Sequence, residues 1–171
     1  MFRFGAVAAA VLALFVFSSA RAQDSSLSLQ ANRAFLTANA NKPGVVVRPS
    51  GLQYRIIQNG YGKQPGLFDS VDVNYTGTLI NGKVFDKTEP GLPANFVVNK
   101  LIPGWTEALT LMREGDHWQL VIPAGLGYGP RAIGPIPPNQ TLVFDLELVK
   151  VTPASKDDQQ DQDQQDQGQS Q

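Results

Sequence analysis

The side chains best suited to chemistry in this sequence are aromatic, with one carboxylate among them. They are Tyr75, Phe85, Asp86, Phe96, Trp105, Tyr128 and Phe144. Aromatic residues dominate protein cores, so residue type alone favours packing over function for such a set. An Asp that follows a hairpin is also ordinarily a loop cap. The set is therefore either part of the core or the lining of an apolar site, and residue type does not distinguish the two.

The sequence offers little for acid–base, nucleophilic or metal chemistry. It contains one His and no Cys, which removes thiol nucleophiles, disulfides and cysteine metal sites together. His117 lies at an expected helix-to-strand turn, and no nucleophile elbow lies near it. Glycines are frequent, but none has the spacing of a phosphate-binding loop. We expect no cofactor and no metal ion, and a hydrolase that uses Asp86 or His117 is a remote alternative.

The charge of the chain argues against nucleic acid as a partner. Lys and Arg together number 14 and Asp and Glu 15, which gives a formal net charge of −1. Neither sign is clustered between the two ends of the chain. A nucleic-acid-binding surface needs a basic stripe that neutralises phosphates, and the sequence shows none.

Both ends of the chain are expected to lie outside the fold. Residues 1–22 combine a positive start, a short apolar run and the ending Ala20-Arg21-Ala22, which is typical of a secretory signal peptide. The apolar run is too short for a permanent membrane helix, so we expect cleavage before Gln23 and no membrane span afterwards. An uncleaved anchor is the alternative. Residues 154–171 are rich in Asp and Gln, and this composition predicts disorder.

The middle of the chain predicts one α+β domain at residues 45–153. Alternating apolar positions and turn signals predict strands at 52–57, 71–80, 83–86, 117–122 and 141–151. Asn81-Gly82 separates two of these strands and is a strong signal for a tight hairpin, since both turn positions need positive φ. Hairpin-linked strands predict an antiparallel sheet.

Two helices are expected. Trp105, Ala108, Leu109 and Met112 have the spacing of an amphipathic helix, which Gly115 would end, and the sheet is expected to wrap around it. A second, short helix is expected at 27–41, within an N-terminal helical segment at 23–44. Its apolar face is weak, so it is either an appended helix or a docking element.

Two long connections interrupt this pattern. Residues 86–95 are polar and contain Pro and Gly, and residues 123–139 contain five Pro and four Gly. A structureless loop of this length inside a compact domain is usually functional or disordered. The prolines and apolar side chains of the second loop favour an ordered cover over something apolar.

Four sequence blocks together resemble the FKBP-type (FK506-binding) prolyl isomerases. They are VNYTGTLINGKVFD at 73–86, LIPGW at 101–105, GLGYG at 125–129 and IPPNQTLVFDLELVKV at 136–151. Their order and spacing also match the family, so the resemblance extends over residues 50–151. Residues 32–60 further resemble the macrophage infectivity potentiator (Mip-like) branch. The resemblance implies the FKBP-like α+β fold and peptidyl-prolyl cis-trans isomerase activity.

The resemblance also implies roles for individual residues. The catalytic group would be Tyr75, Asp86, Trp105 and Tyr128. The substrate-binding group would be Phe85, Phe96, Leu101, Ile102, Ile136 and Phe144. Trp105 would form the pocket floor, Asp86 would be the acid at its mouth, and the Tyr128 hydroxyl would donate to a ligand carbonyl. Contacts from residues 131–135 are not implied, because the loop after Tyr128 is shorter than in related chains.

These assignments agree with the chemistry of the reaction that the resemblance implies. Rotation of an X-Pro bond passes through a twisted amide that has lost its resonance, over a barrier of about 18–20 kcal/mol. An apolar pocket favours this less polar state and excludes the water that stabilises the planar amide. No proton leaves and no covalent bond forms, so the lack of a base, thiol or metal site is expected.

The expected partners follow from the same resemblance. They are proline-containing proteins or peptides and macrolide inhibitors such as rapamycin and tacrolimus. We expect a monomer, because the segment between residue 22 and residue 45 is short for the dimerisation region of Mip-like relatives. We expect secretion, with a bacterial periplasm as the alternative location. The alternative function is an FKBP-fold chaperone or host-interaction module with little catalytic role.

Overall fold

The computed structural model describes residues 25–155. The predicted signal peptide at 1–22 lies outside the described residues, as does the predicted tail from residue 156 onward. Within 25–155, no helix is long and apolar enough to cross a membrane.

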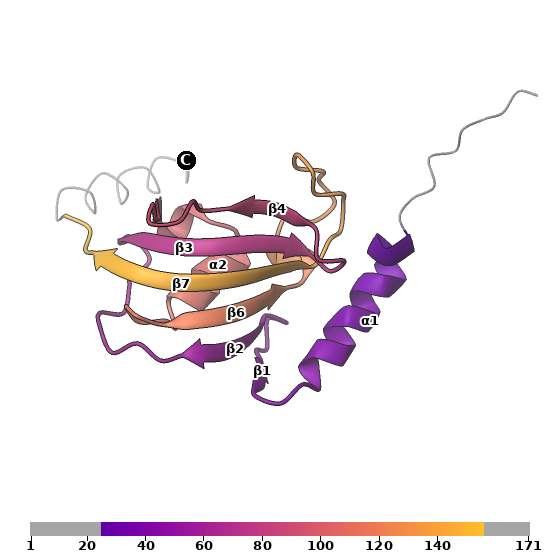
Figure 1. The fold of residues 1–171 in the computed structure, drawn as a ribbon, viewed down its shortest axis with the longest axis horizontal. Helices are drawn as coiled ribbons and strands as arrows, with labels where there is room; N and C mark the ends of the chain where they lie inside the picture. The colour runs from indigo at the N-terminus through magenta and orange to yellow at the C-terminus, as the bar shows by residue number, and fades with distance from the viewer. Residues whose placement is uncertain (1–24, 156–171) are drawn as a thin grey trace, which may run out of the picture.

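The fold is an antiparallel sheet of seven strands that curves around one helix (Figure 1). The strands are β1 Val45–Val47, β2 Gln53–Gln58, β3 Ser70–Leu79, β4 Val84–Lys87, β5 Ala94–Val97, β6 His117–Ile122 and β7 Leu142–Thr152. Their order across the sheet is β1-β2-β6-β7-β3-β4, and β5 also pairs with β3. The helices are α1 Leu29–Ala40 and α2 Pro103–Leu109, with 3-10 turns at Ser25–Leu27, Val98–Lys100 and Ala124–Leu126. The predicted α+β class and wrapped helix are confirmed.

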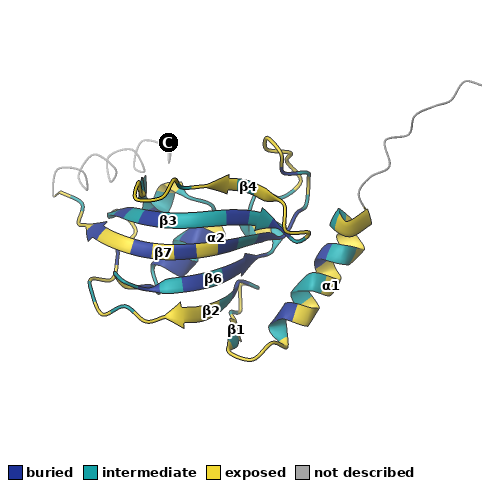
Figure 2. Ribbon diagram, in the orientation of Figure 1, coloured by how far each residue is buried: buried dark blue, intermediate teal, exposed yellow. Residues whose placement is uncertain are grey.

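The core lies between α2 and the inner face of the central strands, which Figure 2 shows as the most deeply buried part of the sheet. In β7, Leu142, Leu146 and Leu148 are almost fully buried, as strand alternation predicts. The alternation changes phase at Val149, because Asp72 pairs with Lys150 while Val73 pairs with Leu148. Val149 is exposed as the alternation requires, and the bulge leaves Lys150 exposed as well and returns Val151 to the core.

The wrapped helix is shorter than its apolar spacing predicts. Pro103 occupies its first turn, but α2 ends at Leu109 instead of continuing to Gly115. The Thr110 carbonyl accepts a hydrogen bond from the Gln64 side chain at 2.6 Å, so a tertiary contact satisfies part of the helix end. Met112 remains fully buried because its amide still bonds the Ala108 carbonyl in the following turn.

Two short strands were not predicted. β1 has three residues and pairs only with β2, and β5 takes up the end of the expected connection at 86–95. Each has too few residues to show alternation. β5 places Phe96 opposite Val71 of β3, which fixes the position of this aromatic side chain in the sheet.

The N-terminal helix docks through amides instead of through an apolar face. α1 lies outside the sheet, beside β1 (Figure 2), and half of its residues are exposed. Its two buried residues are Asn32 and Asn39. They are seven positions apart and therefore lie on one face of the helix.

Candidate active site

The side chains singled out in the sequence meet in a cavity of about 170 Å³. The lining residues are Tyr75, Phe85, Asp86, Phe96, Leu101, Ile102, Trp105, Tyr128 and Phe144. They come from β3, β4, β5, α2 and the turn before it, β7, and the loop at 123–139, which we call the pocket loop. Ile136, the remaining predicted contact, is 5% exposed and packs in the core without lining this cavity.

Trp105 lies at the centre of the aromatic arrangement. It is 4% exposed and meets three rings edge to face: Tyr75 and Phe144 with centroids 5.1 Å away, and Phe96 at 6.0 Å. Edge-to-face contacts are a favoured geometry for aromatic pairs. Three such contacts fix the orientation of the indole. Its Nε1 is buried and has no hydrogen-bond partner among residues 25–155.

Gly77 allows two of the wall residues to approach β3, a role that the sequence reading missed. The rings of Phe85 and Phe144 meet edge to face at 5.5 Å. A Cβ atom at Gly77 would lie 2.6 Å from the Phe85 ring and 2.8 Å from the Phe144 ring. Glycine inside a strand often marks such a close approach, and this was the signal that could have identified it.

The only carboxylate of the cavity is paired with a phenol. The Tyr75 hydroxyl donates to Asp86 Oδ2 at 2.6 Å, while Asp86 Oδ1 accepts the Lys87 amide at 2.9 Å. Burial raises the pKa of Tyr75 well above its ordinary value of 10.0, and the hydrogen bond to Asp86 raises it further. Tyr75 therefore remains a protonated donor throughout the neutral and mildly alkaline range.

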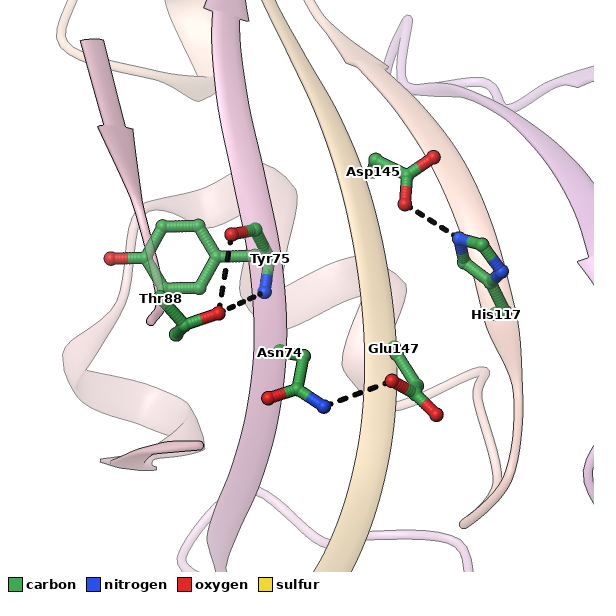
Figure 3. A network of polar contacts seen from close by, with 6 residues as sticks. All are labelled: Asn74, Tyr75, Thr88, His117, Asp145 and Glu147. Carbon is green, nitrogen blue, oxygen red and sulfur yellow. Dashed lines mark hydrogen bonds and ion pairs between the residues drawn. The ribbon is translucent and has the colours of Figure 1, made fainter. Parts of the chain in front are cut away.

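The backbone of Tyr75 is held from the other side by Thr88. The Tyr75 amide donates to Thr88 Oγ1 and the Thr88 amide donates to the Tyr75 carbonyl, both at 3.0 Å. Figure 3 shows Thr88 Oγ1 in contact with both the amide and the carbonyl of Tyr75, whose ring extends from β3 away from Glu147. Thr88 lies just beyond β4, so it connects the strand of Asp86 to that of Tyr75. Thr88 was not predicted from the sequence.

Tyr128 enters the cavity from the pocket loop and is half-buried. Within residues 25–155 its hydroxyl makes no hydrogen bond. Gly129 follows with φ of +57°, a left-handed conformation that glycine adopts readily. The Gly129 amide donates to the Ala124 carbonyl at 2.9 Å and its carbonyl accepts the Asn139 amide at 2.7 Å, so both ends of the pocket loop are tied to the residue after Tyr128.

A second cavity of about 240 Å³ lies near the outer face of the same strands and is polar. Its side chains include Asn74, Glu147, His117 and Asp145, and Asn74 donates to Glu147 at 2.9 Å (Figure 3). His117 begins β6 and its Nε2 lies 2.6 Å from Asp145 Oδ1. Within residues 25–155, no three His, Cys, Asp or Glu side chains are grouped so that they could hold a metal ion.

Comparison with known proteins places this arrangement in a family. The sequence matches FKBP-type peptidyl-prolyl cis-trans isomerases over residues 62–149, and the domain amino terminal to such isomerases over residues 7–56. An outer membrane protein MIP of Legionella longbeachae is 58% identical over 124 residues, which cover 71% of this chain and 53% of the relative. The peptidyl-prolyl cis-trans isomerase Mip of Coxiella burnetii is 50% identical over 122 residues, or 70% of this chain and 53% of the relative.

Solved structures agree with the sequence comparison. FkpA from Escherichia coli superposes with a TM-score of 0.71 at 42% identity, covering 74% of this chain and 60% of FkpA. A peptidyl-prolyl cis-trans isomerase from Pseudomonas syringae gives 0.69 at 37% identity, covering 73% of this chain and 93% of that one. The chain spans about half the length of the curated relatives described above. From the family match and these structures, the chain belongs to the FKBP-type peptidyl-prolyl cis-trans isomerase family.

Proposed function

We propose that this protein accelerates the cis-trans rotation of X-Pro bonds in proteins. One observation carries the proposal: a cavity walled by aromatic side chains holds one exposed carboxylate, Asp86, and the Tyr128 hydroxyl, which has no hydrogen-bond partner within residues 25–155. Such a cavity has no general base or nucleophile of the usual kind, but prolyl rotation needs neither. It needs an apolar surface for the proline ring and polar groups that favour the twisted amide over the planar one.

In this mechanism the two halves of the cavity have different tasks. Trp105 and the surrounding rings bind the proline ring and exclude water, which removes part of the stabilisation of the planar amide. Tyr128 donates its free hydroxyl to a substrate carbonyl and fixes the register of the peptide. Asp86, oriented by Tyr75, presents negative charge to the dipole of the rotating amide. Ile136 belongs to the pocket loop and is buried in the core, so it would anchor the loop and contribute to substrate binding indirectly.

The proposal extends to ligands, location and assembly. Macrolides such as rapamycin and tacrolimus would occupy the same cavity and block turnover. The N-terminal sequence supports export, either out of the cell or into a bacterial periplasm, and one relative carries the name outer membrane protein. We further propose that the mature chain is monomeric, which light scattering of the purified protein measures directly.

The test is a protease-coupled assay with a prolyl peptide, run with and without saturating rapamycin. We expect turnover that rapamycin abolishes. Tyr61→Ala is the control variant, because Tyr61 is 92% exposed and does not line the cavity. It should retain full turnover and full inhibition. A correctly folded wild-type protein without turnover would reject the proposed activity in favour of a chaperone or host-interaction role. Turnover that persists unchanged under rapamycin would reject the cavity assignment.

A further inference from the structure

The N-terminal end of α1 is attached to the pocket loop by a buried amide network. Asn32 is 4% exposed and uses both atoms of its carboxamide. Its Oδ1 accepts the Thr141 amide at 2.7 Å, and its Nδ2 donates to Gln140 Oε1 at 3.1 Å. The Gln140 side chain in turn donates to the carbonyls of Leu27, just before α1, and Pro138, in the pocket loop.

The hydrogen bonds continue from this network to Tyr128. Asn139 lies in the left-handed region at φ +59°, the only residue other than glycine to do so in 25–155. Its amide donates to the carbonyl of Gly129 at 2.7 Å, and Gly129 directly follows Tyr128. Asn adopts this conformation more readily than most residues other than glycine. The two residues that follow it, Gln140 and Thr141, are both held by Asn32.

Removal of the Asn32 amide would therefore affect more than the helix. Thr141 is 1% exposed, so its amide would lose its partner in a place that water reaches poorly. The end of the pocket loop would gain freedom, and with it the position of Tyr128. Local loosening of this kind precedes global unfolding where a loop depends on few contacts.

We propose that Asn32 is a positioning residue for the isomerase, acting through the pocket loop on Tyr128. The proposal rests on the proposed function for its effect on turnover, while the contacts themselves stand apart from it. In this proposal α1 stabilises the position of Tyr128 through the pocket loop, although no residue of α1 lines the cavity. The first turn of α1 and the site on the far side of the pocket loop are then energetically coupled.

The other end of α1 provides a matched control. Asn39 is 3% exposed and donates to Gln53 Oε1 at 2.9 Å, while Gln53 donates to the Leu36 carbonyl at 3.0 Å. This pair has the same chemistry and burial, but it ties α1 to β2 and makes no hydrogen bond to the pocket loop within residues 25–155. Asn32→Ala and Asn39→Ala therefore remove buried carboxamides from opposite ends of one helix, and that of Asn32 makes more hydrogen bonds, including two to the carbonyls of Leu27 and Ser28.

The experiment compares the two variants in the full chain by hydrogen exchange, thermal unfolding and steady-state kinetics. Both should lower the melting temperature. Only Asn32→Ala should speed exchange of the amides at 129–141, and only it should raise KM for a prolyl peptide, by about threefold to tenfold, the factor for one lost hydrogen bond. With Tyr128→Phe, the loss in the double variant should be smaller than the product of the single losses, since both act at one contact.

Several results would overturn the inference. Asn32→Ala with wild-type loop exchange, equal KM increases in both Asn variants, or fully multiplicative losses with Tyr128→Phe would each reduce Asn32 to a structural residue. If Asn32→Ala does not fold, Gln140→Met replaces it; this variant keeps side-chain volume, removes both Gln140 donations, and should give the same loop exchange in weaker form. If wild-type protein has no turnover, the proposed function fails. Hydrogen exchange of the amides at 129–141 still decides whether Asn32 holds the pocket loop.

Discussion

The contact between Asp86 and Tyr75 allows catalysis and stability to be separated by one substitution. Asp86 is exposed at the mouth of the cavity, and its Oδ2 lies 2.6 Å from the Tyr75 hydroxyl. Asp86→Ala removes the carboxylate, but both the remaining phenol and the vacated space can be reached by water. We therefore expect the free energy of unfolding to change by no more than about 1 kcal/mol, as for other exposed polar contacts.

The same substitution should have a larger effect on turnover. A hydrogen bond to a charged group contributes about 1.5–3 kcal/mol, and exposure of Asp86 favours the lower end. A loss of about 1.4 kcal/mol from the transition state corresponds to a tenfold fall in kcat/KM. Asp86→Asn keeps an acceptor for Tyr75 but lacks the charge, so it should recover the orientation of Tyr75 and only part of the rate.

The measurement is kcat/KM beside thermal unfolding for both variants. Asp72→Ala is the control, because Asp72 also accepts a side-chain hydrogen bond at 2.6 Å, from Asn95, at a place that does not line the cavity. It should show a similar small change in stability and unchanged turnover. If Asp86→Ala unfolds the domain while the remaining folded fraction keeps full activity, Asp86 is structural and the catalytic assignment is wrong.

Three further substitutions test other parts of the structure. Trp105→Ala should cost about 3–5 kcal/mol of stability in chemical denaturation and abolish turnover, because the residue is both floor and core. Gly77→Ala should cost about 1–3 kcal/mol through overpacking against Phe85, with a raised KM; wild-type KM would contradict the close approach. The amides of Val151 and Lys63 lower the pKa of Glu114, so its carboxylate stabilises the fold above pH 4.5, and this contribution is lost as pH falls below that value. Glu114→Gln should therefore make the melting temperature depend less on pH below 4.5.

The strands that the sequence predicted well are those whose pattern is local and long. The strand at 71–80 and the return strand after Asn81-Gly82 appear as β3 and β4, because alternation and turn residues act within a few positions. β1 and β5 depend instead on pairing with distant strands. The early end of α2 likewise depends on a side chain at residue 64, which helical periodicity does not contain.

The residues of the cavity divide in the same way, into those that the sequence predicts and those whose roles depend on distant contacts. Its aromatic members were identified from residue type and family resemblance, and they meet because β3, β7 and α2 form as predicted. Gly77 and Thr88 were missed, since their roles depend on the distance between strands and not on their own chemistry. For the helix at 27–41 the sequence left open an appended helix or a docking element, and it did not identify the amides through which α1 docks. From polarity alone, Asn32 and Asn39 would be assigned to a solvent-exposed face of the helix. A buried amide is recognised only when its hydrogen-bond partner is known.

These missed residues share a function that follows from the proposed reaction. An enzyme that transfers no proton and forms no bond has only shape and electrostatics with which to distinguish a twisted amide from a planar one. Its selectivity then depends on how rigidly the side chains that line the cavity are held, because side chains that shift bind the twisted and the planar amide equally well. Gly77 brings two rings together, Thr88 fixes the strand of Tyr75, and Asn32 holds the end of the pocket loop. On this reasoning, residues that never touch substrate contribute to the rate by holding in place those that line the cavity.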